Sequence, residues 1–85
     1  MNYKKFIKER DEMLMKRDVN ELRKFVAAHA DDYGEEIARQ VADEGDSFLE
    51  VVLHKSIVLA TTLPEDFRAD SEAWLLKWRD KNEQR

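Results

Sequence analysis

Residues 47–66 read SFLEVVLHKSIVLATTLPED and form the least polar stretch of a chain in which 40% of the residues are charged. Many of these side chains are β-branched, which favours a strand. A hairpin, however, would need a turn near residues 54–56, where no Gly, Asn, Asp or Pro stands. On a helical wheel Ser47, Glu50, His54 and Thr61 fall in one narrow polar sector. Lys55 and Ser56 lie outside this sector, and nearly every other position is aliphatic or aromatic. The stretch therefore predicts a mostly apolar central helix over about residues 48–62, covered on most sides and open to water along one thin stripe.

The composition of the whole chain also favours helices and a single domain. The chain has 85 residues with two Gly and one Pro, which is little turn chemistry for an all-β protein. It has no Cys, which excludes disulfides, Cys-based metal sites and a thiol nucleophile. We predict one helical domain over residues 1–85 with a thin core, because a domain of this size buries only about 60–65% of its unfolded surface.

Charged residues interrupt every apolar stretch. The longest segment without an acidic or basic residue is residues 56–64, which is nine residues, whereas a membrane helix needs about 20. The first residues carry a charge every two or three positions, which does not suit a secretion signal. We expect a cytoplasmic protein that does not act at a membrane.

Four short polar residues, each followed three positions later by Glu, have the pattern of a capping box at a helix start. They stand 14 or 15 residues apart, at Asp18, Asp32, Ser47 and Thr62. Apolar residues at helical spacing stand before Asp18 and after each of these four cap residues. The predicted fold is all-α, a compact bundle of four or five short helices with a charged C-terminal tail at about residues 80–85.

The net charge of −4 is unevenly distributed along the chain. Residues 1–30 have a net charge of +3, residues 31–70 of −8 and residues 71–85 of +1. The acidic middle segment would repel phosphates, so we expect no direct binding of nucleic acid. A helix-turn-helix over residues 22–42 fails for the same reason, because its second helix would carry four acids and one Arg.

Two groups of polar residues resemble catalytic or metal sites, but each has a simpler structural explanation. Glu50 and His54 stand at i and i+4 on the polar stripe, where such a pair could exchange a proton, yet no third group is predicted to orient them. His29 precedes four nearby carboxylates, at Asp31, Asp32, Glu35 and Glu36. Helix dipoles favour a His at a C-terminus and acids at an N-terminus without any metal. We predict no metal, no cofactor and no enzymatic activity.

Trp74 and Trp78 stand at i and i+4 in the last predicted helix. Trp side chains fill small cores efficiently, and they also anchor protein interfaces. Core packing is the simpler explanation for Trp74, whereas both roles stay open for Trp78 near the chain end. Both are kept as candidate partner-binding residues.

These observations favour a small non-catalytic protein-interaction module. The chain carries more aliphatic helix surface than 85 residues easily hide, so the first hypothesis for its partner is a second copy, in a homodimer. The alternative is an acidic inhibitor or nucleic-acid mimic whose carboxylates occupy a basic groove of a partner protein. A small enzyme using Glu50 and His54 ranks behind both. The candidate partner-binding residues are Trp74, Trp78, Asp43, Glu44 and Asp46.

Overall fold

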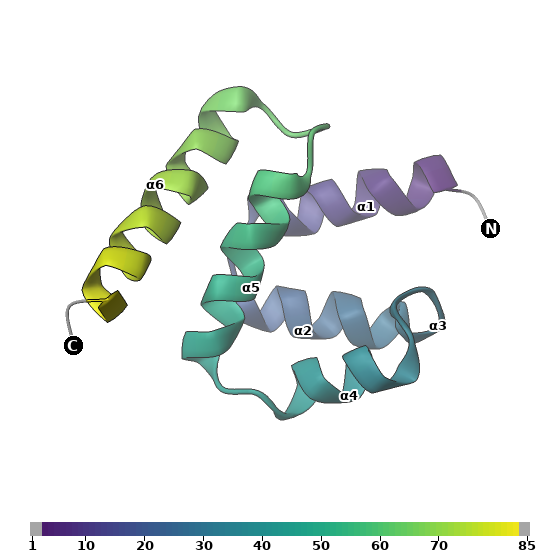
Figure 1. Cartoon of the computed structure of the whole chain (residues 1–85). Coiled ribbons are helices and arrows are strands. Elements are labelled where there is room, and N and C mark those ends of the chain that lie inside the picture. Colours follow the sequence, from purple (N-terminus) through teal and green to yellow (C-terminus); the bar gives the residue numbers. More distant parts are fainter. Residues whose placement is uncertain (1–2, 84–85) are drawn as a thin grey trace.

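Helices make up nearly all of the computed structural model, which describes residues 3–83 (Figure 1). In this part of the chain the helices are α1 (Tyr3–Met15), α2 (Val19–Ala28), α3 (Ala30–Tyr33), α4 (Glu35–Asp43), α5 (Asp46–Leu59) and α6 (Glu65–Glu83). The prediction of an all-α bundle is confirmed. The element beyond the predicted four or five is α3, a single turn between α2 and α4. Because α6 continues to Glu83, the predicted charged tail is helical at its start, while residues 84–85 lie outside the described part.

The helices form two layers, which pack against α5 from different sides. The first layer contains α1, α2 and α4, which lie roughly side by side, and α5 crosses it (Figure 1). The second layer is α6, which returns antiparallel to α5 and packs mainly on it (Figure 1). Consequently α5 contacts α1 and α2 on one side and α6 on the other, as expected for a central helix.

The core is centred on α5, because its apolar residues recur at the spacing of one helix face. Leu49, Leu53 and Ile57 are 0–2% exposed, and Leu14 of α1 packs among them with no exposed surface. The helix begins at Asp46 and ends at Leu59, so the predicted central helix is confirmed and its predicted end at about residue 62 is wrong. The chain turns earlier, because the amide of Ala60 bonds back to the carbonyl of Ile57.

Only one of the four predicted capping residues forms a side-chain cap. The carboxylate of Asp18 accepts from the amide of Asn20 at 2.8 Å and starts α2. Asp32 lies inside α3, and α4 starts after Gly34, whose φ of 94° suits glycine. Ser47 lies inside α5, which follows Gly45. Thr62 instead donates its hydroxyl proton to Asp11 of α1 and so ties the α5–α6 connection to the first layer.

The prediction that the polar stripe of the central helix is exposed to solvent is wrong at His54. This side chain is half-buried and faces α6, where its Nδ1 lies 2.9 Å from the hydroxyl of Ser71. Glu50 and Lys55 are exposed, but so is Leu59, which is 80% exposed. The error arose because a helical wheel records polarity and not which sides neighbouring helices will cover.

The bundle is flat and exposes much surface for its size. Its principal extents are 43 × 30 × 16 Å, and its radius of gyration is 13.4 Å, compared with roughly 12 Å for a compact domain of this length. The chain exposes 6276 Å², whereas a compact monomer of 10.1 kDa exposes roughly 5,300 Å².

The role of α5 can be tested by truncating leucines of different burial. We expect Leu53→Ala, at a site 2% exposed, to lower the free energy of unfolding by about 2–5 kcal/mol. The matched control Leu76→Ala, at a site 44% exposed on α6, should lower it by about 1 kcal/mol or less. Urea unfolding followed by circular dichroism measures both.

If Leu53→Ala does not fold, Ile57→Val, at a site with no exposed surface, has an expected cost of about 1 kcal/mol. Its matched control Ile37→Val, at a site 50% exposed, should cost less than about 0.5 kcal/mol. Equal losses at positions 53 and 76 would contradict the central position of α5.

Candidate functional site

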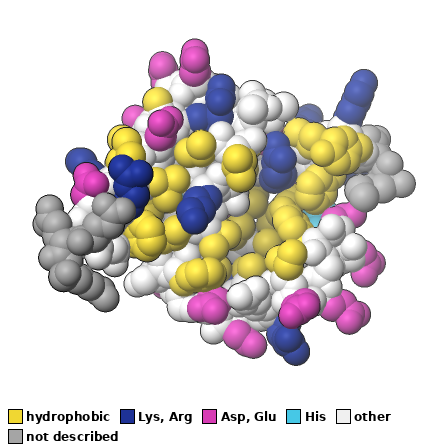
Figure 2. All heavy atoms as spheres, viewed as in Figure 1, with side chains coloured by type: hydrophobic (Ala, Val, Ile, Leu, Met, Phe, Trp, Pro, Cys, Tyr) yellow, Lys and Arg dark blue, Asp and Glu magenta, His cyan; other side chains and the backbone are white. Residues whose placement is uncertain are grey.

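An apolar groove opens where α1, α2, α4 and α5 meet. Its volume is about 290 Å³, and it reaches down to the buried core. Figure 2 shows hydrophobic side chains gathered across the middle of this face. The lining residues are Phe6, Arg10, Met13, Leu14, Leu22, Val26, Tyr33, Ile37, Val41, Val52, Ser56 and Leu59.

Two large aliphatic side chains stand at the rim of the groove. Leu59, at the end of α5, is 80% exposed, and Ile37, on α4, is 50% exposed. Fully burying such a side chain stabilises a structure by about 1.5–3 kcal/mol relative to leaving it in water. The rim therefore offers binding energy that the bundle itself does not use.

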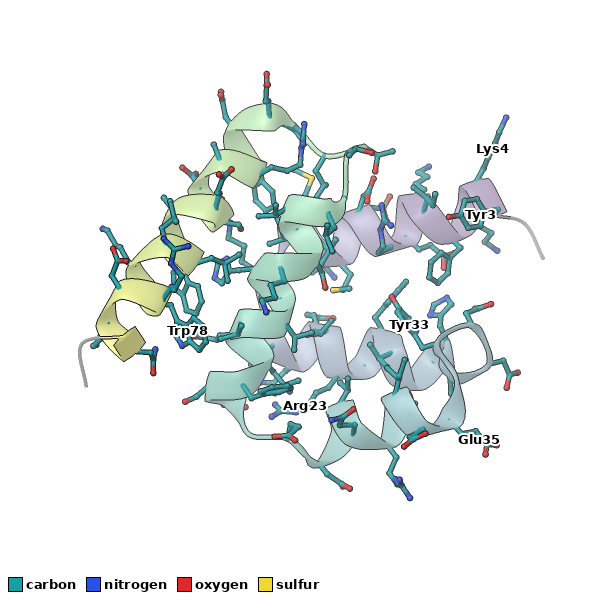
Figure 3. All side chains as sticks on the ribbon, viewed as in Figure 1. Tyr3, Lys4, Arg23, Tyr33, Glu35 and Trp78 are labelled. Carbon is teal, nitrogen blue, oxygen red and sulfur yellow. The ribbon has the colours of Figure 1, made fainter. Side chains whose placement is uncertain are left out.

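Arg10 and Tyr33 supply the main polar groups of the groove. The guanidinium of Arg10 donates to Asp11 at 3.0 Å and to the hydroxyl of Thr62 at 3.2 Å, so its direction is set by the α5–α6 connection. The ring of Tyr33 lies 6.0 Å from that of Phe6 and points into the space between α1 and α2 (Figure 3). Burial raises the pKa of Tyr33, with Arg10 acting in the opposite direction, so its hydroxyl stays neutral at physiological pH.

The two edges of the groove face carry opposite charge. The start of α1 carries Lys4, Lys5 and Lys8 and no acid. The segment from α3 to α4 carries five acids and one Arg, the acids being Asp31, Asp32, Glu35, Glu36 and Asp43. Figure 3 places Lys4 and Glu35 at opposite edges, with Tyr33 between them. All nine of these charged side chains, including Arg39, are exposed.

His54 and Ser71 form a second polar site, between α5 and α6. The ring of His54 also stacks on Trp74, with centroids 4.2 Å apart and planes 20° apart. A Ser–His pair near a carboxylate, here Glu50, has the composition of a nucleophilic site. Ser71 has no exposed surface, however, and Trp74 covers one face of the imidazole. The arrangement therefore fastens α6 to α5 and leaves the hydroxyl no route to a substrate.

The structure places the predicted partner-binding residues on two elements, with both Trp on α6 and the three acids at the α4–α5 connection. Trp74 is half-buried on His54, whereas Trp78 is 40% exposed on α6. Asp46 forms an ion pair with Arg23 at 2.6 Å, and the same guanidinium donates to the carbonyl of Glu44 at 2.9 Å. These contacts fasten the α4–α5 connection to α2 (Figure 3). Asp43 is exposed on α4.

None of the four acids that closely follow His29 in the sequence forms an ion pair with it within residues 3–83. Its Nδ1 lies 2.9 Å from the carbonyl of Phe25, and its Nε2 lies 3.5 Å from a carboxylate oxygen of Glu9, an acid of α1. His29 ends α2, as its position in the sequence predicted. Within residues 3–83 no group of three or more His, Asp or Glu side chains is placed to hold a metal ion.

A scan against protein-family models found no match, and neither did searches of curated proteins and of solved structures. In the part of the chain that the structure describes, no helix combines the length and apolarity that crossing a membrane requires.

The groove was missed by sequence reasoning, although its residues were assigned to helices. Ile37 and Val41 belong to the predicted apolar face of their helix, and both line the groove. The available signal was the apolar surface of residues 48–62, which extends around most of the helix. Which part of it stays uncovered depends on where α1, α2 and α4 pack.

His54 should make stability depend on pH. Burial lowers the pKa of His54, Glu50 raises it and Arg17 lowers it further, with burial the largest effect. The unfolded chain therefore binds the His54 proton at a higher pH than the folded chain, and stability falls as pH drops below about 6.5.

We expect the thermal midpoint of His54→Gln to fall less than that of the wild type between about pH 7.5 and about pH 5.5. Most carboxylates stay ionised in this interval, and Gln retains a hydrogen-bonding group for Ser71. An equal fall in both proteins would contradict burial as the cause.

Proposed function

We propose that this protein is a small non-catalytic interaction module that binds an apolar protein segment in the groove between α1, α2, α4 and α5. The observation that carries the proposal is the exposure of Leu59 and Ile37 at the rim of a groove continuous with the core. Contiguous apolar surface of this kind is typical of protein-binding sites. Self-association remains the first form of this proposal.

The lining of the groove indicates the chemistry of the bound segment. A groove walled by helices suits an amphipathic helix, which presents apolar side chains at i, i+3, i+4 and i+7. The neutral Tyr33 hydroxyl and the Arg10 guanidinium add polar contacts that would fix the orientation of such a helix. We propose that the module works in the cytoplasm, whose reducing conditions suit a fold stabilised without disulfides.

A second candidate function is supported by the acidic edge. The exposed carboxylates of α3 and α4 lie on one side of the molecule, as nucleic-acid mimicry would require. Of the three acids first assigned to partner binding, Asp46 already pairs with Arg23. Partner binding through this edge alone would weaken strongly with added salt and would not depend on Leu59, whereas binding in the apolar groove requires Leu59.

We do not propose catalysis at Glu50 and His54. The Nδ1 atom of His54 is hydrogen-bonded to the hydroxyl of Ser71, and the imidazole ring is stacked on Trp74. A general base must reach the proton that it removes, and this side chain faces the interior of the α5–α6 contact.

The groove can be tested with a matched pair of charge insertions. We expect Leu59→Glu to abolish capture of partner proteins from lysate of the native host, because a carboxylate at the rim would be desolvated on binding. Leu76→Glu makes the same change on α6, outside the groove lining, and should leave capture intact.

Quantitative mass spectrometry of both pull-downs measures the effect, after circular dichroism has confirmed that both variants fold. Loss of the same partners from both variants, or from neither, would contradict binding in the groove.

A further inference from the structure

We infer that the occupant of the groove is a second copy of this chain, docked face to face about a two-fold axis that runs along the groove, so that the basic α1 edge of each copy lies along the acidic α3–α4 edge of the other. This inference rests on the proposed function, because it names the partner of the same groove.

The charge distribution supports this orientation. Residues 3–8 have a net charge of +3, and residues 30–43 have a net charge of −4. The two segments border opposite sides of the groove (Figure 3). A two-fold axis along the groove exchanges the two edges, so the basic edge meets the acidic edge twice in one symmetric contact. The other way of facing two grooves would set α1 against α1 and would bring like charges together.

Some of the charges on these edges remain available for a partner, although Lys5 pairs with Glu9. Lys4 and Lys8 form no ion pair within residues 3–83, and neither do Glu36 and Asp43. By contrast, Arg10, Arg17 and Arg23 each pair with an Asp of the same chain. The unpaired edge charges are therefore able to select a partner of complementary charge.

The size of the molecule also fits a dimer. A stable interface buries roughly 800 Å² on each partner, and the bundle, with extents of 43 × 30 × 16 Å, has a broad side large enough for it. A face-to-face contact would cover Ile37, Leu59 and the groove lining together. A second copy would thus supply both the complementary charges and the apolar surface that this face presents.

The experiment is a charge swap read by light scattering after size exclusion. The first variant carries Lys4→Glu and Lys8→Glu, and the second carries Glu36→Lys and Asp43→Lys. Each variant alone removes the attraction between the edges of its own dimer, because the first sets net charges of −1 and −4 against each other and the second sets +3 against zero. We expect the dimer Kd of each to rise about tenfold or more. An equal mixture of the two variants restores the wild-type charges of +3 and −4 at one edge and sets the new Glu side chains against the new Lys side chains at the other, so heterodimers should form more tightly than either homodimer.

The controls separate this inference from the proposed function. A variant with Lys77→Glu and Lys81→Glu makes the same charge change on α6, and its dimer Kd should equal that of the wild type. Leu59→Glu should be monomeric, while Leu76→Glu should dimerise. Circular dichroism verifies that each variant folds.

Several results would overturn the inference. A wild-type chain that runs at 10.1 kDa from low micromolar to submillimolar concentration would exclude the second copy, while partner capture that depends on Leu59 would still support the groove. Dimers that persist in Leu59→Glu would place the contact elsewhere. A mixture of the charge variants that fails to associate would exclude the proposed orientation.

Discussion

The structure depends on the burial of α5 from two directions. Leu49, Leu53 and Ile57 recur at i, i+4 and i+8, and all are almost completely buried. Neither the α1–α2–α4 layer nor α6 encloses this helix alone, because each covers only part of its circumference. The α4–α5 and α5–α6 connections hold the neighbouring helices in position against α5. Thr62 binds Asp11 across the α5–α6 connection, and Arg23 holds the connection between α4 and α5.

The α6 helix is held on the opposite side of α5 by a different set of contacts. Ser71 is small enough to be fully buried, and its hydroxyl meets His54. At the α1–α2 turn Arg17 adopts a left-handed conformation, with φ of 52°, and its guanidinium lies 4.2 Å from the centre of the Phe67 ring. A positive φ is uncommon in a residue other than Gly. The contact with α6 helps to offset that local cost.

This arrangement makes the bundle flat, and a flat bundle leaves the groove uncovered. Two layers on one central helix give a bundle whose shortest extent is 16 Å. No helix of the described chain covers the place where α1, α2 and α4 meet the end of α5, so Leu59 and Ile37 remain exposed at the rim. The same layer sets the start of α1 and the α3–α4 segment at opposite edges of this opening (Figure 3). Apolar surface and segregated charge thus occupy one face.

The sequence by itself determined the helices and their apolar faces, because periodicity and the scarcity of Gly, Pro and Cys are local properties. It identified α5 as the central helix and Asp18 as a cap. It did not predict that His54 would face Ser71, nor that Leu59 would stay in water. Those outcomes depend on which of several apolar faces find a partner within 85 residues. Only the tertiary structure decided this, because packing joins residues 6, 33 and 59, which no sequence period relates.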